Sequence, residues 1–188
     1  ADAIDADCER YQTVYAKTRG SIAAPTAGLH FTPEVLDAVR DKGVTVAEIT
    51  LHVGYGTFEP VRVDELSDHA VSPEIYEMSA ETTALLNTAK ADGRRIVAVG
   101  TTTTRALETN IARFGRFTDG IHTADLTIVP GHNFAAVDAL LTNFHLPMSS
   151  LLVLVSTFGG HELIMRAYRH AVAAKYRFYS YGDCMLIV

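Results

Sequence analysis

Residues 95–108 read Arg-Ile-Val-Ala-Val-Gly-Thr-Thr-Thr-Thr-Arg-Ala-Leu-Glu, and this stretch organises the rest of the chain. The apolar run 96–99 is short enough for a strand that is buried on both faces, as in a parallel sheet. Gly100 permits a sharp turn, and the threonines supply hydroxyls where a helix needs capping. Apolar residues then recur at helical spacing, at Leu107, Ile111 and Phe114. The sequence therefore predicts a strand–turn–helix unit.

The predicted helix start is a candidate seat for an anion. The first turn of a helix leaves backbone N–H groups without partners, and such groups bind negative charge. Arg105 lies one turn inside and would add a cation to the seat. The candidate seat consists of Gly100, Thr101, Thr102, Thr103 and Arg105. The alternative is a well-capped helix that packs on a sheet, with Arg105 on its exposed face.

Length and composition set the broad class. The chain has 188 residues, 48% of them hydrophobic, which is enough for one domain with a real core. The longest apolar run, around 151–155, is far too short to span a membrane. The chain opens with an acidic stretch instead of a signal peptide, and Cys8 and Cys184 have no redox or metal spacing, so we expect a cytoplasmic protein. The formal charge of −6 argues against holding a polynucleotide by charge, although a local basic patch would still permit it.

The remaining pattern alternates between strands and helices. Strands are expected at 44–53, 74–78 and 125–129. Helices are expected after Thr32, after Ser79 and over 161–175, whereas 151–155 is either a buried helix or a strand. We therefore predict a layered α/β/α sandwich with a mostly parallel sheet. It forms a single domain over residues 21–188, after a leading segment, residues 1–20.

Several polar side chains are candidates for chemistry. None of the eight histidines has a metal-ligand spacing, so no metal site is predicted. His30 and His52 adjoin glycine-containing turns, and His145 lies in the dense polar–aromatic turn 142–147. The alternative for each is a buried histidine with a hydrogen-bonded partner. Loops like 142–147 carry function more often than stability.

The loop 54–60 has spaced glycines but is not a dinucleotide fingerprint, because the third glycine is absent and Pro60 blocks the helix. Gly54, Gly56 and Thr57 are nevertheless candidates for contact with a substrate. Asp183 is either a ligand-binding group or a turn-former. Carboxylates at Glu74 and Glu108 are possible bases, although such carboxylates commonly lie on the surface.

Six stretches together carry a resemblance to a known family: 9–16, 25–32, 50–58, 98–105, 142–147 and 180–187. In this order they resemble the S-adenosylmethionine:tRNA ribosyltransferase-isomerases of queuosine biosynthesis, from about Glu9 to Ile187. Members of that family are almost twice as long. The resemblance implies that this chain is a carboxy-terminal portion without the family's inserted β-barrel domain, and that residues 1–20 follow from the missing part. We expect the 188-residue chain alone to be inactive.

The resemblance also implies a reaction. The ribosyl part of S-adenosylmethionine is transferred to 7-aminomethyl-7-deazaguanine in tRNA, which gives epoxyqueuosine and releases adenine and methionine. S-adenosylmethionine is a substrate here, so no metal and no cofactor is expected. The expected partners are S-adenosylmethionine and tRNA, with no membrane and a monomer as the default.

This chemistry needs a base, an acid for the departing adenine and donors for the methionine carboxylate. His30, His52 and His145 are the acid–base candidates, because imidazole changes protonation near neutral pH. Arg105 and the range 101–103 are candidates for binding a carboxylate or phosphate, and Asn143 and Asp183 for base or ribose hydroxyl groups. The competing hypotheses are a non-catalytic RNA-binding module and a metal-dependent hydrolase.

Overall fold

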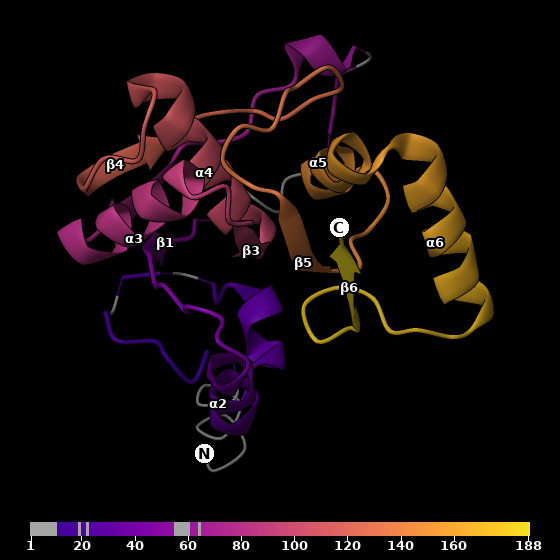
Figure 1. Ribbon diagram of the computed structural model, residues 1–188. Helices are drawn as coiled ribbons and strands as arrows, with labels where there is room; N and C mark the ends of the chain where they lie inside the picture. Colours follow the sequence, from indigo (N-terminus) through magenta and orange to yellow (C-terminus); the bar gives the residue numbers. More distant parts are fainter. Residues whose placement is uncertain (1–10, 19, 22, 55–60, 64) are drawn as a thin grey trace.

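The structure, a computed structural model, describes residues 11–18, 20–21, 23–54, 61–63 and 65–188 (Figure 1). The described residues form five α-helices: α2 (Pro33–Asp41), α3 (Ala80–Ala91), α4 (Thr101–Phe114), α5 (Ser150–Gly159) and α6 (His161–Ala173). Six strands accompany them: β1 (Thr50–His52), β2 (Glu74–Met78), β3 (Val97–Val99), β4 (Gly120–Ala124), β5 (Ala139–Asn143) and β6 (Cys184–Ile187). Two short 3₁₀ helices, η1 (Thr26–His30) and η3 (Leu66–Asp68), complete the described elements. The predicted α/β class is confirmed.

The strands form two small sheets instead of one. Strands β1, β2 and β4 make an antiparallel sheet in the order β1-β2-β4. In the second sheet, of order β3-β5-β6, β3 pairs with β5 in parallel and β6 pairs with β5 antiparallel. The prediction of a mostly parallel sheet is therefore wrong for the part of the chain that is described. Parallel pairing needs a long crossover, and among the described pairs only β3 and β5 are joined by one that returns in the same direction.

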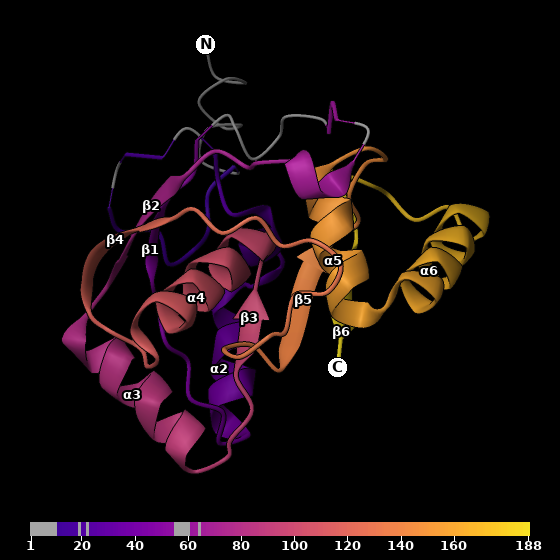
Figure 2. The same ribbon diagram turned by 90° about the horizontal axis from the view of Figure 1, so that it is seen from above.

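Helix α4 connects the two sheets. It contacts β4 of the first sheet, β3 and β5 of the second sheet, and helix α5 (Figure 2). The core around it contains Tyr76, Phe117, Leu140 and Val155, all almost completely buried. Because β3 runs directly into α4, the first turn of this helix stands at the carboxyl end of the second sheet.

Most helix starts agree with the sequence. The hydroxyl oxygens of Thr32, Ser79 and Ser149 each accept a hydrogen bond from a first-turn backbone N–H, at 3.3, 3.1 and 3.1 Å. The ambiguous segment 151–155 is helical, within α5. The part of the chain that the structure describes has no helix long and apolar enough to cross a membrane. The domain boundary at residue 20 stays a prediction.

One expected strand is much shorter than predicted, and another is displaced along the chain. Of 44–53 only Thr50–His52 pairs, and the backbone carbonyl of Glu48 accepts a hydrogen bond from the Thr82 hydroxyl at 2.9 Å. Residues 125–129 are irregular because the strand comes earlier, at Gly120–Ala124, and the Leu126 carbonyl accepts from Arg105 instead of from a neighbouring strand.

Burial of the central unit is also lower than expected. Val97 is 51% exposed and Phe114 is 41% exposed. The two faces of strand β3 therefore differ in burial, since Ala98, on the face opposite Val97, is 1% exposed.

Candidate functional site

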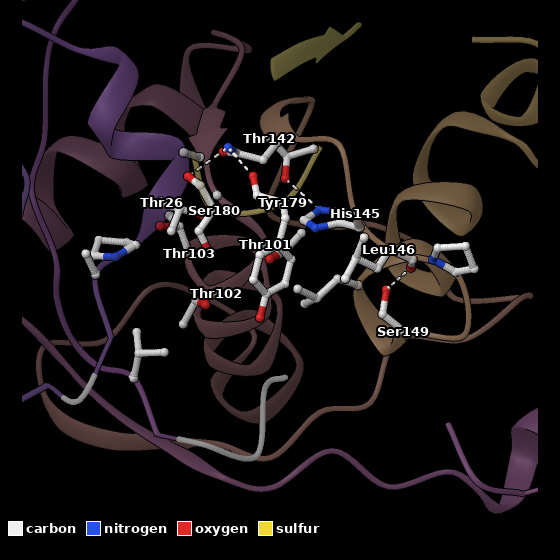
Figure 3. Close-up of a pocket in the computed structure, with 18 of the residues that line it drawn as sticks. Thr26, Thr101, Thr102, Thr103, Thr142, His145, Leu146, Ser149, Tyr179 and Ser180 are labelled. Carbon is white, nitrogen blue, oxygen red and sulfur yellow. Dashed lines mark hydrogen bonds between the residues drawn. The ribbon is translucent and has the colours of Figure 1, made fainter. Parts of the chain in front are cut away.

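A pocket lies where β3 and β5 end and where α4 and α5 begin (Figure 3). Segments far apart in the sequence meet there, because the carboxyl ends of parallel strands open on one edge of a sheet. Its described lining residues are Ala24, Pro25, Thr26, Ala27, Val53, Gly100, Thr101, Thr102, Thr103, Thr142, Asn143, His145, Leu146, Pro147, Met148, Ser149, Leu151, Tyr179 and Ser180. None of these side chains is Asp, Glu, Lys or Arg.

The first turn of α4 is open toward this pocket. Gly100 precedes the helix with φ of 96°, a conformation that favours glycine, and no side chain among the described residues caps the helix. The hydroxyls of Thr103 and Thr104 donate to backbone carbonyls one turn back, at 2.8 and 3.1 Å. The idea that the threonines cap the helix is thus wrong. The N–H groups of the first turn, together with the Thr101 and Thr102 hydroxyls, remain for a ligand.

A second helix start faces the same pocket. Ser149 caps α5 by accepting from the Leu152 N–H at 3.1 Å, and its own hydroxyl donates to the Leu146 carbonyl at 2.7 Å. Ser150 is 6% exposed, and its hydroxyl oxygen has no hydrogen-bond partner among the described residues. Both helices present the positive end of their dipole to the pocket, which favours an anionic or electron-rich group.

His145 is the one histidine among the described residues that line the pocket. Its Nε2 lies 3.0 Å from the Thr142 hydroxyl, and its backbone N–H donates to the Tyr168 hydroxyl at 2.9 Å. Burial lowers the pKa of His145 from 6.5 to about 4. The imidazole is therefore neutral at pH 7, which corrects the expectation that its protonation changes near neutral pH.

Asn143, the last residue of β5, fixes one part of the pocket wall. Its side-chain amide donates to the carbonyls of Tyr179, Ser180 and Gly182, at 3.1, 3.4 and 3.4 Å. Its Oδ1 is buried without a partner among the described residues. The residue therefore lines the pocket, as predicted, but its donors hold the loop that brings Tyr179 and Ser180 there.

Asp183 serves the same loop from outside the pocket. Its carboxylate accepts from the backbone N–H and the guanidinium of Arg177, at 2.7 and 2.9 Å. Hydrogen bonds from Arg177 lower the pKa of Asp183, so it stays ionised. Gly182 is required beside it, since a Cβ there would lie 2.5 Å from the Arg177 carbonyl oxygen. Asp183 is thus a turn-former, the alternative that the sequence left open.

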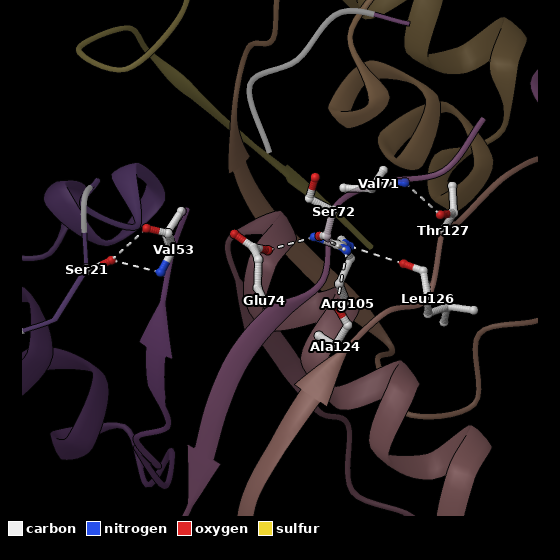
Figure 4. A network of polar contacts seen from close by, with 9 residues as sticks. All are labelled: Ser21, Val53, Val71, Ser72, Glu74, Arg105, Ala124, Leu126 and Thr127. Carbon is white, nitrogen blue, oxygen red and sulfur yellow. Dashed lines mark hydrogen bonds and ion pairs between the residues drawn. The ribbon is translucent and has the colours of Figure 1, made fainter. Parts of the chain in front are cut away.

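Arg105 does not reach the pocket. It is 2% exposed, and its guanidinium pairs with the Glu74 carboxylate at 2.6 Å (Figure 4). Its remaining hydrogen bonds go to the carbonyls of Ser72, Ala124 and Leu126. Burial lowers the pKa of Arg105, and the Glu74 charge opposes that change. Arg105 therefore fastens α4 to β2 and β4, which corrects both the anion seat and the exposed-face alternative.

Glu108 is likewise a buried connector instead of a surface carboxylate. It is 1% exposed and accepts three backbone hydrogen bonds, from the N–H groups of Ala135, Ala136 and Val137, at 2.9–3.0 Å. Glu74 is 4% exposed and bound to Arg105. Neither carboxylate lines the pocket, so neither is a base for a ligand there.

The other candidates are not among the described lining residues of the pocket, or they fall outside the residues that the structure describes. His30 ends η1, with its Nε2 buried and without a partner among the described residues, whereas Thr26 and Ala27 of η1 line the pocket. His52 packs on Gly20, where a Cβ would lie 2.9 Å from the ring Nδ1. Gly54 follows the lining residue Val53. Gly56 and Thr57 fall outside the described residues.

Sequence reasoning brought six of the pocket residues together: Gly100, Thr101, Thr102, Thr103, Asn143 and His145. It missed Tyr179 and Ser149, although Tyr179 immediately precedes the stretch 180–187. Among the residues that the structure describes, no group of three or more His, Cys, Asp or Glu could hold a metal ion.

Comparison with known proteins gives a consistent result. The family model described as "Queuosine biosynthesis protein" matches residues 1–187. The S-adenosylmethionine:tRNA ribosyltransferase-isomerases of Syntrophotalea carbinolica and Symbiobacterium thermophilum are 55% and 56% identical over 97% and 96% of this chain. A crystal structure of S-adenosylmethionine tRNA ribosyltransferase from Thermotoga maritima is 47% identical, with a TM-score of 0.69 over 87% of this chain and 51% of its own. The chain spans about half, 53%, of the length of the curated relatives that it matches.

Proposed function

The chain belongs to the queuosine biosynthesis protein family, and from that premise we propose that the protein containing it is an S-adenosylmethionine:tRNA ribosyltransferase-isomerase. The resemblance inferred from six sequence stretches is confirmed at the level of the family. In the proposed reaction, the ribosyl group of S-adenosylmethionine moves to 7-aminomethyl-7-deazaguanine in tRNA, and adenine and methionine leave. A cytoplasmic location follows for the proposal, because its tRNA substrate is there.

The open first turn of α4 is the observation that carries the proposal to particular residues. S-adenosylmethionine has a carboxylate, and the pocket offers unpaired N–H groups and two hydroxyls, at Thr101 and Thr102, but no cationic side chain among its described lining residues. A helix start binds a carboxylate without a competing fixed charge. We therefore assign the methionine carboxylate to this turn.

His145 suits a neutral part of the substrate. An imidazole with a pKa of about 4 is uncharged at pH 7, and the sulfonium of a bound substrate would disfavour its protonation further. It is a poor general base but a good hydrogen-bonding partner, held in place by Thr142. We assign it to adenine or to a ribose hydroxyl, in place of the acid–base role that the sequence indicated.

The test is a reconstitution with the protein containing this chain. It is mixed with S-adenosylmethionine and tRNA that carries 7-aminomethyl-7-deazaguanine, and the nucleosides are identified by mass spectrometry. We expect epoxyqueuosine, with one adenine and one methionine released per product. EDTA should leave the rate unchanged, because the sequence predicts a metal-free reaction. Tight tRNA binding without any new nucleoside would favour the RNA-binding module instead.

A further inference from the structure

The carboxy-terminal helix and the loop after it have a net positive charge, opposite in sign to that of the whole chain. Residues 161–182 contain four of the sixteen Lys and Arg residues but only one of the twenty-two acidic residues, Glu162. Arg177 is paired with Asp183 directly after the segment, which leaves three cations against one carboxylate. This segment is therefore positive, although the formal charge of the whole chain is −6. Such a local reversal is the electrostatic mark of a surface for a polyanion.

The basic side chains lie on one face of α6. Arg166, Arg169 and His170 are three and four residues apart, which places them on the same side of a helix. All three are exposed, whereas Ile164 and Ala171, on the opposite side, are 2% and 0% exposed. The structure shows no ion pair for Arg166 or Arg169 among the described residues. We call Arg166, Arg169 and the exposed Lys175 that follows the helix the α6 cationic face.

The position of α6 leaves this face open. Helix α6 lies at the outer edge of the molecule, on the side opposite α3, and packs on α5 (Figures 1 and 2). Its inner face supports the pocket, because the Tyr168 hydroxyl accepts from the His145 N–H at 2.9 Å. Helix α6 therefore supports the pocket wall through Tyr168 and presents Arg166 and Arg169 to solvent.

The chain leads directly from the cationic face into the pocket. After Lys175 come Tyr176 and Tyr181, 44% and 60% exposed, and between them Tyr179 and Ser180 line the pocket. The loop is rigidly built, with Asp183 and Asn143 holding its backbone. Single-stranded RNA loops bind where exposed aromatic rings stand next to basic side chains that contact phosphates.

We propose that the α6 cationic face and the tyrosine loop that follows it, residues 176–181, bind the phosphate backbone of the substrate tRNA and direct its modified base into the pocket. This inference rests on the proposed function, which makes tRNA the substrate. Arg166, Arg169 and Lys175 contact phosphates, so they supply affinity in a way that does not depend on base sequence.

The test compares two double variants of the protein containing this chain. R166Q/R169Q removes two charges from the face without adding repulsion next to Glu162. The matched control, K42Q/K90Q, removes two exposed charges from the ends of α2 and α3. Dissociation constants for the modified tRNA are measured between roughly 50 and 200 mM salt, together with KM for S-adenosylmethionine and the melting temperature.

For R166Q/R169Q we expect about tenfold weaker tRNA binding at low salt, and a slope of log affinity against log salt that is shallower by about 1.4–1.8. KM for S-adenosylmethionine and the melting temperature should match those of the control. R166K/R169K should restore most of the binding, because lysine keeps the charge that a phosphate contact needs.

If R166Q/R169Q left the tRNA affinity and its dependence on salt unchanged, the proposal that the α6 cationic face binds tRNA would be overturned, even if the wild-type protein transfers ribose. Conversely, wild-type protein that binds tRNA with the expected salt slope but forms no product would contradict the proposed function and support the surface. Loss of tRNA binding together with a lowered melting temperature in R166Q/R169Q, and no rescue by lysine, would also overturn it.

Discussion

The wall of the pocket and the layer directly behind it differ in charge, although α4 contributes to both. The described wall has no Asp, Glu, Lys or Arg side chain. One and two turns further along α4, Arg105 and Glu108 are almost fully buried, and each is bound to several groups. The first turn of the helix thus faces the ligand site, and the next turns hold the fold together.

This difference shows where a buried charge is useful in the molecule. A desolvated charge needs its own partners, so it fixes neighbouring elements and has no capacity left for a ligand. Backbone N–H groups and hydroxyls at a helix start are neutral and stay available when the site is empty. The following predictions test whether the wall and the layer behind it are separable.

The largest effect is expected from Arg105→Ala. The change removes the guanidinium that neutralises the buried Glu74 carboxylate and leaves the carbonyls of Ser72, Ala124 and Leu126 without a donor. The free energy of unfolding should fall by about 3–5 kcal/mol. Urea denaturation of the protein measures it.

A double variant sharpens this result. Arg105→Met combined with Glu74→Leu removes both charges and should recover much of the lost stability, because the cost lies mainly in an uncompensated charge. If Arg105→Ala weakened S-adenosylmethionine binding but left unfolding unchanged, Arg105 would belong to the wall and the comparison would break.

A smaller effect on stability is expected from the protonation of His145 at low pH, which would put a positive charge on the otherwise neutral pocket wall. Its pKa is lowered from 6.5 to about 4 in the folded protein, so folding favours the neutral ring. The resulting stability is fully present above pH 6.5 and is lost as the pH falls toward 4. Over that window His145 should account for a loss of about 3 kcal/mol.

The measurement is the free energy of unfolding of the wild type and His145→Asn between pH 7.5 and 4.5. The difference between the two proteins should shrink as the pH falls, and the NMR titration of the His145 ring should have its midpoint near the low pKa. A ring that titrates near 6.5 would mean that water reaches it and that the wall is not desolvated there.

The sequence predicted the helix starts and the threonine turn because these depend on local chemistry. A cap is set by one hydroxyl and the N–H group three residues later, as at Thr32 and Ser79. The same local reasoning located Gly100 and the first turn of α4, which supply four of the residues that line the pocket.

Sequence reasoning could not identify hydrogen-bond partners that lie far apart along the chain. Arg105 meets Glu74 across 31 residues, and Asn143 holds the loop at Tyr179 across 36, so their roles depend on the tertiary arrangement. The pattern of residues 125–129 is that of a strand, but Arg105 takes the Leu126 carbonyl that a ladder would need. Local propensity is overridden where a buried side chain takes a backbone group.

The smallest effect separates two neighbouring threonines of one helix. Thr102 lines the pocket, whereas Thr104 is 0% exposed and donates to the Gly100 carbonyl at 3.1 Å. Thr102→Ala should remove one neutral hydrogen bond to the substrate, about 0.5–1.5 kcal/mol, and raise KM for S-adenosylmethionine roughly two- to tenfold without changing the melting temperature. Thr104→Ala should do the opposite, lowering stability by about 1–2 kcal/mol with KM unchanged. Should Thr104→Ala raise KM while Thr102→Ala leaves it unchanged, the first turn of α4 would not be the carboxylate site.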